Sequence, residues 1–331
     1  MVALYVTSPY AGAGKTAVCA GLGRHLDGDG KKVGFFKPLV SEIKGLEAVD
    51  SDAEFMKQVL ALKEPINSLC PVIGGDGDMT TKIKQAYARV SRGKKVVIVE
   101  GVWRQRPGGK SFEAIRLGAE ALDSRVIVVE PYSEGLSKVI SNYRGFGEYL
   151  LGVVVNKVPR SRVKPLYEQL SGGNILGVLP EDRVLISLTV GELAEHIQGE
   201  ILNSAEKSSE LVEDFMLGAM GVDSGLDYFS RKDNKAVVLR SERPDMQLAA
   251  LETSTRCLVV SGASPSHIVL QKARDKGVPI IVVKGDINST VSSIELALGK
   301  GRFNQEKKLP RLGEIMEQQF NFKALYQGLG L

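Results

Sequence analysis

The sequence VALYVTSPYAGAGKT, residues 2–16, is the most informative segment in the first half of the chain. Its apolar start predicts a buried strand, and the glycines that follow let the backbone curl so that several N–H groups point inward at a phosphate. Lys15 and Thr16 begin a predicted helix, whose N-terminus adds partial positive charge. In such a loop the lysine reaches the β- and γ-phosphates of a nucleotide, and the threonine hydroxyl binds Mg²⁺. The sequence therefore predicts a P-loop with the nucleotide-binding residues Gly12, Ala13, Gly14, Lys15, Thr16 and Ala17.

Short apolar runs alternate with longer amphipathic segments through the first 180 residues. Most runs are rich in β-branched residues and nearly free of polar ones, which is typical of strands covered on both faces by helices. The predicted strands are 2–7, 32–36, 95–100, 125–130, 151–156 and 174–179. The predicted helices are 15–26, 51–62, 79–92, 112–121, 133–143 and 162–170. This alternation predicts an α/β domain with a doubly wound, mostly parallel sheet.

A second alternation follows a polar segment at 199–211 and predicts a smaller α/β domain of about three strands. Its predicted strands are 236–239, 257–261 and 279–283, and its predicted helices are 244–253, 265–276 and 290–298. We therefore expect a first domain at 1–203, a second at 204–310, and a C-terminal tail at 311–331 that either docks as an arm or stays mobile.

The composition argues against several classes of site and partner. A net charge of only +4, with scattered Lys and Arg residues, does not favour non-specific binding to nucleic acid. The three cysteines form no CxxC pair and the three histidines are far apart in sequence, which argues against a zinc site and for a reducing compartment. The chain starts without the features of a signal peptide, and no apolar run approaches the roughly 20 residues that a membrane helix needs. We expect a cytoplasmic protein that binds neither nucleic acid nor membrane.

Two residues at predicted strand ends are ambiguous when each is taken alone. Lys37 follows the second predicted strand, at the edge where α/β sheets bind ligands. There it either adds a positive charge over the phosphates or is a solvated strand-end lysine, and position alone favours the solvated lysine. Asn156 ends a buried predicted strand, where its amide can pair with a base edge or simply close a turn.

Acidic residues at two places are candidate metal ligands. Asp50 is a natural N-cap for the predicted helix that follows it, and Asp52 lies in the first turn of that helix, where a helix-dipole role or a metal role fits. Glu100 ends an apolar predicted strand just before a glycine, which is the pattern of a Walker-B-like carboxylate. The alternative for Glu100 is a surface acid at a strand end. Mg²⁺ prefers oxygen ligands and keeps water, so Thr16, one or two of these carboxylates and phosphate oxygens would complete its shell.

Taken in order, these motifs resemble the dethiobiotin synthetase-like P-loop family over residues 1–200. The shared motifs are Gly14-Lys15-Thr16, Phe36-Lys37-Pro38, Ser51-Asp52, Val99-Glu100-Gly101 and Asn156-Lys157. The resemblance implies that ATP and Mg²⁺ are bound, with Asp52 and Glu100 completing the metal site and Asn156 reading the adenine base. Lys15 and Lys37 are the catalytic candidates that it implies.

The chain also departs from that family. Pro9 replaces a glycine of the common P-loop motif, and Ala11 and Gly12 stand where the synthetases usually carry threonine and an acidic residue. The segment Gly-Val-Trp-Arg at 101–104 replaces a Gly-Ala-Gly-Gly-type loop. The differences at 11–12 and 101–104 lie where the synthetase holds its diamino acid substrate, so ATP binding is better supported than dethiobiotin synthesis.

Residues from about 210 to 310 resemble the DRTGG domain, so the chain as a whole is similar to the N-terminal regulatory part of long phosphate acetyltransferases. The matching segments are 218–220, 241–245, 248–252 and 285–290. An acetyl-transfer domain follows in those enzymes and is expected to be absent here, so acetyltransferase activity is not expected. Glu242, Arg243 and Asp245 either form a ligand site in the second domain or are a helix cap with surface charges.

These observations favour a regulatory or sensing module that binds ATP and Mg²⁺ and acts on a separate acyl- or phosphotransferase. The alternative is an ATP-dependent ligase of the dethiobiotin synthetase type, acting on a small carboxylate or amine, and a purely structural scaffold is a third class. A homodimer is expected, because the resembling synthetases place their sites near a dimer interface.

Overall fold

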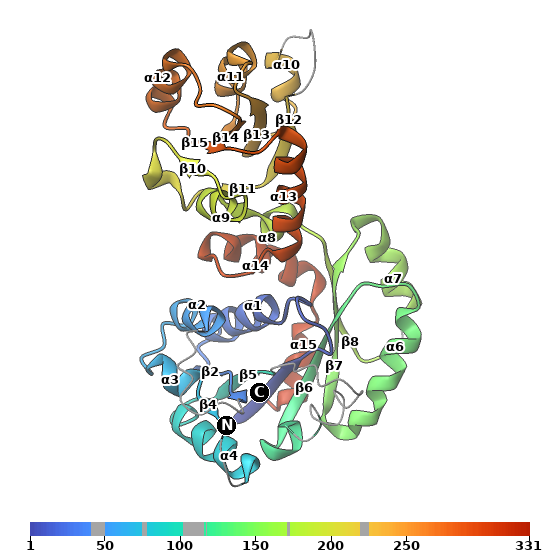
Figure 1. Ribbon diagram of the computed structural model, residues 1–331. Helices are drawn as coiled ribbons and strands as arrows, with labels where there is room; N and C mark the ends of the chain where they lie inside the picture. The colour runs from blue at the N-terminus through green and yellow to red at the C-terminus, as the bar shows by residue number, and fades with distance from the viewer. Residues whose placement is uncertain (41–49, 75–77, 102–115, 117, 171–172, 219–224) are drawn as a thin grey trace. The chain divides into compact units, whose positions relative to one another are not determined.

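The computed structural model describes the chain except for residues 41–49, 75–77, 102–115, 117, 171–172 and 219–224 (Figure 1). The described residues form two compact units. Unit 1 consists of Met1–Glu181 and Phe303–Leu331, and unit 2 consists of Asp182–Arg302. In sequence, unit 2 is therefore an insertion between two parts of unit 1.

A parallel sheet of six described strands forms the centre of unit 1, in the order β2-β5-β1-β6-β7-β8. The strands are β1 (Val2–Thr7), β2 (Val33–Phe36), β5 (Val96–Glu100), β6 (Ser124–Pro131), β7 (Leu150–Val158) and β8 (Ile175–Pro180). They confirm the predicted strands with nearly the same bounds. The chain moves from β1 towards one edge to form β2, and later towards the other edge through β6, β7 and β8. The strand order thus reverses beside β1, and such a reversal opens a crevice at the carboxyl ends of the strands.

Helices follow most of these strands, as the sequence predicts. They are α1 (Lys15–Gly28), α2 (Ser51–Val59), α3 (Ile66–Leu69), α4 (Met79–Val90), α6 (Leu136–Asn142) and α7 (Val163–Gln169). α1 packs against α2, and α3 packs against α4 on the opposite side of β2 and β5 (Figure 1). A small parallel pair, β3 (Leu39–Val40) and β4 (Val72–Ile73), lies between these helical segments in sequence.

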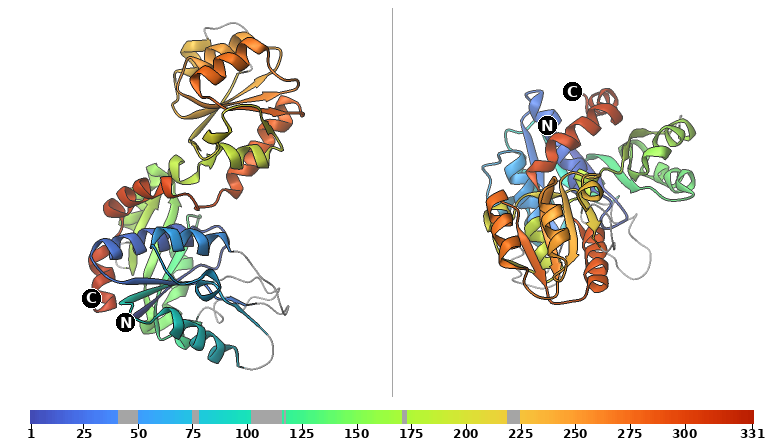
Figure 2. Two further views of the ribbon diagram at one scale, coloured as in Figure 1. Left: turned by 90° about the vertical axis from the view of Figure 1, so that its left-hand side faces the viewer. Right: turned by 90° about the horizontal axis from the view of Figure 1, so that it is seen from above.

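The C-terminal residues 303–331 belong to unit 1 and contain two helices, α14 (Leu309–Gln319) and α15 (Phe322–Leu329). α14 lies against α1 (Figure 2), where a Cβ atom on Gly21 would come within 2.0 Å of Met316 Sδ. Further along α1, the His25 ring stacks on Phe322 with centroids 3.4 Å apart. Phe320 pairs with Gly177 at the outer edge of β8. The C-terminal tail, for which the sequence allowed either a docked arm or a mobile segment, is therefore docked on the P-loop helix and on the sheet edge.

Unit 2 contains a second sheet, of five described strands in the order β10-β15-β14-β13-β12. The strands are β10 (Glu200–Ile201), β12 (Asp214–Leu217), β13 (Lys235–Arg240), β14 (Thr255–Ser261) and β15 (Ile280–Val283). β12 to β15 are parallel and follow one another in chain order, and β10 is antiparallel at the edge. In this sheet the order of the parallel strands never reverses.

Two helical layers cover the sheet of unit 2 (Figure 2). One layer consists of α10 (Gly225–Phe229), α11 (Pro244–Leu251) and α12 (His267–Lys276), and the other of α9 (Val190–His196) and α13 (Ile287–Lys300). Alternate residues of β13 face opposite layers: Val237 and Leu239 pack with the first layer, Ala236 and Val238 with the second. This alternation explains why β13 reads as a continuous apolar run.

The structure divides the chain at different places from the sequence-based boundaries after residues 203 and 310. Residues 182–203 lie in unit 2, where they form α8 (Arg183–Ile186), β9 (Leu188–Thr189), α9 and β10. β9 pairs with β11 (Leu211–Val212), and β10 pairs with β15. The sequence predicted about three strands of the five-stranded sheet and missed β10, which has two residues, and β12, which has four. A strand of two residues has no periodicity to detect.

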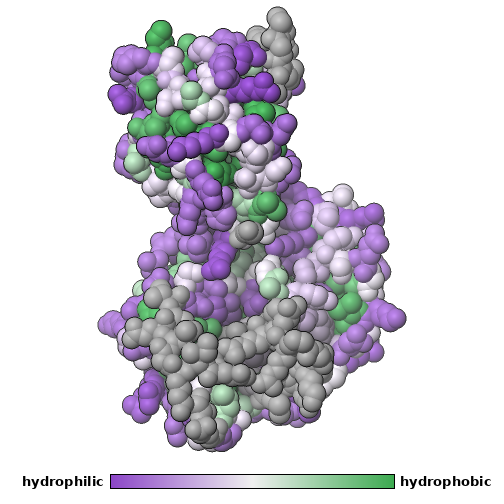
Figure 3. Space-filling view, viewed as in Figure 1, coloured by the Kyte–Doolittle hydropathy of each residue, from purple (hydrophilic) through white to green (hydrophobic). Residues whose placement is uncertain are grey.

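The face of the molecule drawn in Figure 3 is mixed in polarity. Polar residues predominate on the face drawn in Figure 3, and apolar residues occur in small groups between them. No helix in the described part of the chain is both long and apolar enough to cross a membrane.

Candidate functional site

The P-loop segment connects β1 to α1 at the carboxyl edge of the unit 1 sheet. Gly12 and Gly14 have φ angles of 68° and 95°, in a region that other residues rarely adopt. Gly14 is the N-cap of α1, and no side-chain cap is found at this helix end in the described residues. The first N–H groups of α1 are therefore available to bind an anion such as a phosphate.

Asn156, near the carboxyl end of β7, lies directly on the P-loop. Its Nδ2 atom donates a hydrogen bond to the Ala13 carbonyl oxygen at 2.8 Å. A Cβ atom placed on Gly14 would come within 2.1 Å of the same nitrogen, so the close approach of this amide requires glycine. The structure thus brings the predicted base-reading residue together with the predicted phosphate loop.

Thr16 and Glu100 join the P-loop helix to β5. The Thr16 hydroxyl donates to Glu100 Oε1 at 3.0 Å, and β5 lies next to β1 with Glu100 opposite Val6. Glu100 is only 2% exposed, and its Oε2 atom accepts no hydrogen bond from the described residues. A buried carboxylate oxygen without a donor is unfavourable, and a bound cation would remove that cost.

Lys37, just beyond β2, is buried among carboxylates. Its Nζ atom lies 2.9 Å from Asp50 Oδ2, 2.6 Å from Asp52 Oδ2 and 3.8 Å from Glu100 Oε1. We call Asp50, Asp52 and Glu100 the carboxylate cluster. The side chain is only 9% exposed, so the interpretation of Lys37 as a solvated strand-end lysine, which position alone favoured, is wrong.

Burial and charge shift the pKa values of three groups at this site. Burial raises the pKa of Glu100 to about 7, although the ammonium groups of Lys37 and Lys15 act in the opposite direction. Burial alone would lower the pKa of Lys37, but Glu100, Asp52 and Asp50 together raise it. Burial lowers the pKa of Lys15, partly offset by Glu100. Such a concentration of shifted groups in one place is typical of functional sites.

The residues at this site fit a magnesium ion. The Thr16 hydroxyl and the Asp52 and Glu100 carboxylates are oxygen ligands of the kind that Mg²⁺ prefers, and Glu100 Oε2 is an unpaired acceptor among them. The described residues contain no group of three or more His, Cys, Asp or Glu side chains that could hold a metal ion. Mg²⁺ usually completes its shell with water and phosphate oxygens, so water and the phosphates of a nucleotide would supply the remaining ligands.

Sequence reasoning assigned Asp50 a capping role only. Its carboxylate does accept hydrogen bonds from the N–H groups of Asp52 and Ala53, as an N-cap does, and it also holds the Lys37 ammonium group. The signal available in the sequence was a second acidic residue two positions before Asp52. Which side chain would face it could not be deduced from that spacing.

A second buried acid at the same sheet edge was also missed. The Tyr143 hydroxyl donates to Glu130 Oε2 at 2.5 Å, and both residues are buried. Burial raises the pKa of Glu130. The signal was the same as for Glu100, namely an acidic residue at the end of an apolar run.

The candidate residues of unit 2 lie together at the start of α11. Arg243 Nε and Nη2 donate to Asp245 at 3.0 and 2.8 Å, and Glu242 accepts a hydrogen bond from the Ser241 hydroxyl at 3.1 Å. Arg243 is the N-cap residue, and Pro244 occupies the first helical position. These contacts are those of a helix start with hydrogen-bonded charged residues at the surface.

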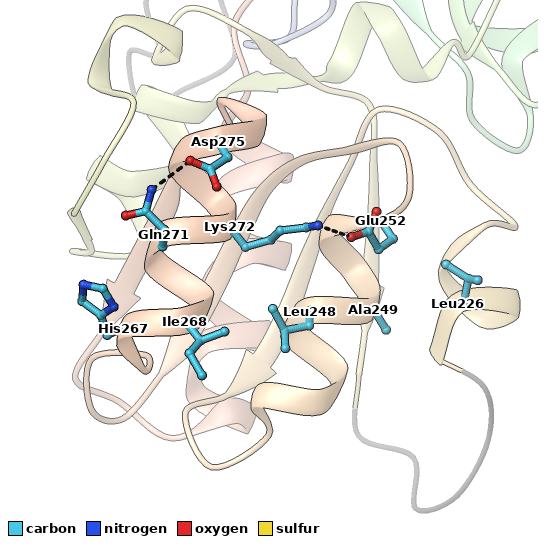
Figure 4. A pocket seen from close by; sticks show the side chains of 9 residues that line it. All are labelled: Leu226, Leu248, Ala249, Glu252, His267, Ile268, Gln271, Lys272 and Asp275. Atoms are coloured by element: carbon cyan, nitrogen blue, oxygen red, sulfur yellow. Dashed lines mark hydrogen bonds and ion pairs between the residues drawn. The ribbon is translucent and has the colours of Figure 1, made fainter.

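A groove of about 680 Å³ lies elsewhere on unit 2, between α10, α11 and α12 (Figure 4). Leu226, Leu248, Ala249 and Ile268 form its apolar part, and Lys272 is paired across it with Glu252 at 2.7 Å. His267, Gln271 and Asp275 complete the lining. None of the three unit 2 candidates lines this groove.

Some sequence motifs fall outside the described residues. They are positions 102–104 of the altered loop after Glu100, and residues 219–220 of the DRTGG-like segments.

Sequence comparisons identify both halves of the chain. Residues 2–189 match the AAA domain family, and residues 192–297 match the DRTGG domain family. The phosphate acetyltransferase of Nitrosomonas europaea is 26% identical over 357 aligned residues, which cover 98% of this chain and 50% of that protein. An ATP-dependent dethiobiotin synthetase of Caldicellulosiruptor saccharolyticus is 31% identical over 116 residues, which cover 30% of this chain and 48% of that protein. The chain thus spans about half the length of the phosphate acetyltransferases it matches.

Comparison with solved structures gives weaker similarities. The CBS and DRTGG domains of the regulatory region of Clostridium perfringens pyrophosphatase, complexed with its activator diadenosine tetraphosphate, match with a TM-score of 0.31 and 14% identity. That match covers 43% of this chain and 70% of the other. A score at this level adds nothing to what the sequence families establish. From the extent of the sequence matches, the chain belongs to the AAA domain family, carries a DRTGG domain after the residues that match that family, and is related over nearly its whole length to phosphate acetyltransferases.

Proposed function

We propose that unit 1 binds ATP together with Mg²⁺ at the P-loop, and that the chain is a regulatory or sensing module. The observation that carries the proposal is the hydrogen bond from Thr16 to the buried Glu100, beside a helix N-terminus without a side-chain cap. Oxygen ligands for a metal therefore lie next to a binding site for phosphate.

Each residue of the site has a part in this proposal. The loop N–H groups and Lys15 bind the phosphates, and Lys37 adds a second positive charge near them. Thr16, Asp52 and Glu100 hold the metal ion, which neutralises phosphate charge when it is bound. Asn156 pairs with the base, because an Asn amide can donate to and accept from adenine.

The regulatory role rests on the domain pairing. The similarity to phosphate acetyltransferases extends over both units, whereas the similarity to a dethiobiotin synthetase covers only 30% of the chain. We accordingly propose a separate acyl- or phosphotransferase as the regulated partner, and a cytoplasmic homodimer as the form of the protein.

Titration with a fluorescent ATP analogue, with Mg²⁺ and with EDTA, tests the nucleotide site. Lys15→Ala should weaken binding by roughly a hundredfold, because a charge-assisted contact to phosphate is lost in a partly buried site. Lys32→Ala, at an exposed lysine just before β2, is the control and should leave the affinity unchanged. No binding by the wild type, or equal binding by Lys15→Ala, would contradict the proposal.

One observation favours a second candidate, an ATP-dependent ligase. Lys37 is a buried cation in addition to Lys15, and phosphoryl transfer depends on charge neutralisation of this kind. Measuring ADP release with a panel of small carboxylates and amines separates the two functions. Fast turnover with one substrate favours the ligase, and no turnover across the panel favours the regulatory module.

A further inference from the structure

The carboxylate cluster already holds a cation, the Lys37 ammonium group. Nζ lies within hydrogen-bond distance of Asp50 and Asp52, and 3.8 Å from the Oε1 atom of Glu100. Two of these three partners, Asp52 and Glu100, are the predicted ligands of the metal ion. A lysine side chain thus lies at the carboxylates that a divalent metal would need.

The three partners differ in how firmly they are fixed. Asp50 is held in place as the N-cap of α2, because its carboxylate accepts two backbone N–H groups as well as Lys37. Asp52 lies in the first turn of the same helix, and Glu100 keeps one oxygen atom without a donor. Lys37 can therefore remain attached to Asp50 while its contacts with Asp52 and Glu100 are exchanged for others.

Charge decides which cation the cluster can accept. With Lys37 present, a second cation beside Asp52 and Glu100 would be repelled by the ammonium group at close range. Without Lys37, three carboxylates would be left near one another with only Lys15 to offset part of their charge, an arrangement that attracts a divalent ion. The phosphates of a bound nucleotide are anions that can take over the contact with Lys37.

We propose that Lys37 is the resident counter-ion of the carboxylate cluster, and that a divalent metal enters only when nucleotide phosphates draw this ammonium group away from Asp52 and Glu100. The inference rests on the proposed nucleotide site and adds the condition under which that site takes up a metal ion. Metal and nucleotide bind together, and the protein without nucleotide does not take up the metal.

Manganese binding to the full chain, measured by electron paramagnetic resonance without nucleotide, tests this rule. Mn²⁺ replaces Mg²⁺ as the probe because it prefers the same oxygen ligands. We expect the wild type to bind Mn²⁺ at least about tenfold more weakly than Lys37→Met, which removes the charge but keeps a similar side-chain length. Lys37→Arg keeps the positive charge and should behave as the wild type does.

Lys94→Met is the matched control, because Lys94 is also partly buried and pairs with a carboxylate, Glu64, at 3.0 Å in the same unit. It should leave Mn²⁺ binding at the wild-type level. Adding Glu100→Gln to Lys37→Met should abolish the gained binding. If Lys37→Met does not fold by circular dichroism, Lys37→Gln replaces it, since glutamine can still donate to Asp50.

Three results would overturn the inference. They are equal Mn²⁺ binding by the wild type and Lys37→Met, a gain of similar size in Lys94→Met, and, in a wild type that binds the nucleotide, no strengthening of Mn²⁺ binding when ADP is added. The ATP-analogue titration is scored separately. A wild type that binds nucleotide while Lys37→Met gains no metal refutes the counter-ion role alone, whereas a gain of metal by Lys37→Met in a protein that binds no nucleotide refutes the nucleotide site alone.

Discussion

The two sheets of this protein have the same layered construction and differ in the order of their strands. In unit 1 the order reverses beside β1, and residues from β2, β5, β7 and the P-loop meet at one edge. In unit 2 the parallel strands follow in chain order, and the charged residues after β13 pair with neighbours one or two positions away. The difference indicates that a parallel sheet gathers distant residues into a site where its order reverses.

Two buried lysines, one in each unit, also differ in the residues that surround them. Lys37 lies among three carboxylates, which raise its pKa, whereas Lys235 in unit 2 donates to the Thr253 hydroxyl and the Ser254 carbonyl at 2.9 and 3.0 Å. Burial lowers the pKa of Lys235. Lys37 is thus a cation paired with carboxylates, whereas Lys235 at the start of β13 donates hydrogen bonds to uncharged oxygen atoms.

The largest expected effect is that of replacing a P-loop glycine that has a positive φ angle. Gly14→Ala would force an alanine into a strained conformation and place its Cβ within 2.1 Å of Asn156 Nδ2. We expect ATP-analogue affinity to fall on the order of a thousandfold, because strain of about 1–3 kcal/mol adds to displacement of the amide.

Gly277→Ala is the corresponding change in unit 2. Gly277 has a φ of 62° at the C-cap of α12, and nothing lies within 4 Å of an added Cβ. It should destabilise unit 2 by about 1 kcal/mol and leave nucleotide affinity unchanged. Equal affinity losses in the two variants would show that the P-loop glycine has no special role.

A smaller effect is expected where the C-terminal helix covers α1. Met316→Ala removes a side chain that is 1% exposed and packs against Gly21. The stability of unit 1 should fall by about 3 kcal/mol, the usual cost of such a cavity. Hydrogen exchange of amides in β5, a strand that α1 contacts, measures this unit separately from unit 2.

Leu296→Ala is the control for this cavity, because Leu296 on α13 is 65% exposed. It should change exchange in neither unit by more than about 0.5 kcal/mol. If Met316→Ala left the β5 amides equally protected, α14 would contribute nothing to the stability of the P-loop unit.

The smallest effect concerns a carboxylate of unit 2 that also faces two cations. Asp214 pairs with Arg183 at 2.6 Å and with Lys232 at 2.7 Å. Burial acts to raise the pKa of Asp214, but these two partners outweigh it and lower the pKa below its ordinary value of 3.8. In Glu100 burial prevails instead. The pKa of Asp214 is therefore lowered, because its cationic partners outweigh burial, whereas the pKa of Glu100 at the candidate site is raised, because burial outweighs its partners.

Asp214→Asn should destabilise unit 2 by about 1 kcal/mol at neutral pH, since its partners are largely solvated. A carboxyl group whose pKa is lowered in the folded state stabilises the folded state at every pH above the ordinary pKa of the group. This contribution to the free energy of unfolding disappears as the pH falls through the lowered pKa. The difference between variant and wild type in hydrogen exchange of β13 should therefore shrink as the pH falls below 3.8 and vanish below the lowered pKa. Asp275→Asn, at an exposed residue, should show no such difference, and a constant difference across the pH range would contradict the assignment.

The sequence predicted most of unit 1 because its strands are long apolar runs buried on both faces. It predicted less of unit 2, where β10 has only two residues and where residues 182–203 belong to this unit rather than to the first. At the site, strand ends indicated which residues gather at one edge. They did not indicate that Lys37 faces Asp50 and Asp52, because that contact depends on how α2 begins beside β2.

The insertion of unit 2 into unit 1 has a consequence for the order in which the protein is made. Residues 182–302 are contiguous, so unit 2 is complete in sequence as soon as Arg302 leaves the ribosome. Unit 1 must wait for residues 303–331, and until then the face of α1 around Gly21 lacks the cover that Met316 provides. Chains in synthesis expose apolar surface in this way, so the helix that follows the P-loop reaches its final packing only after unit 2 is complete in sequence.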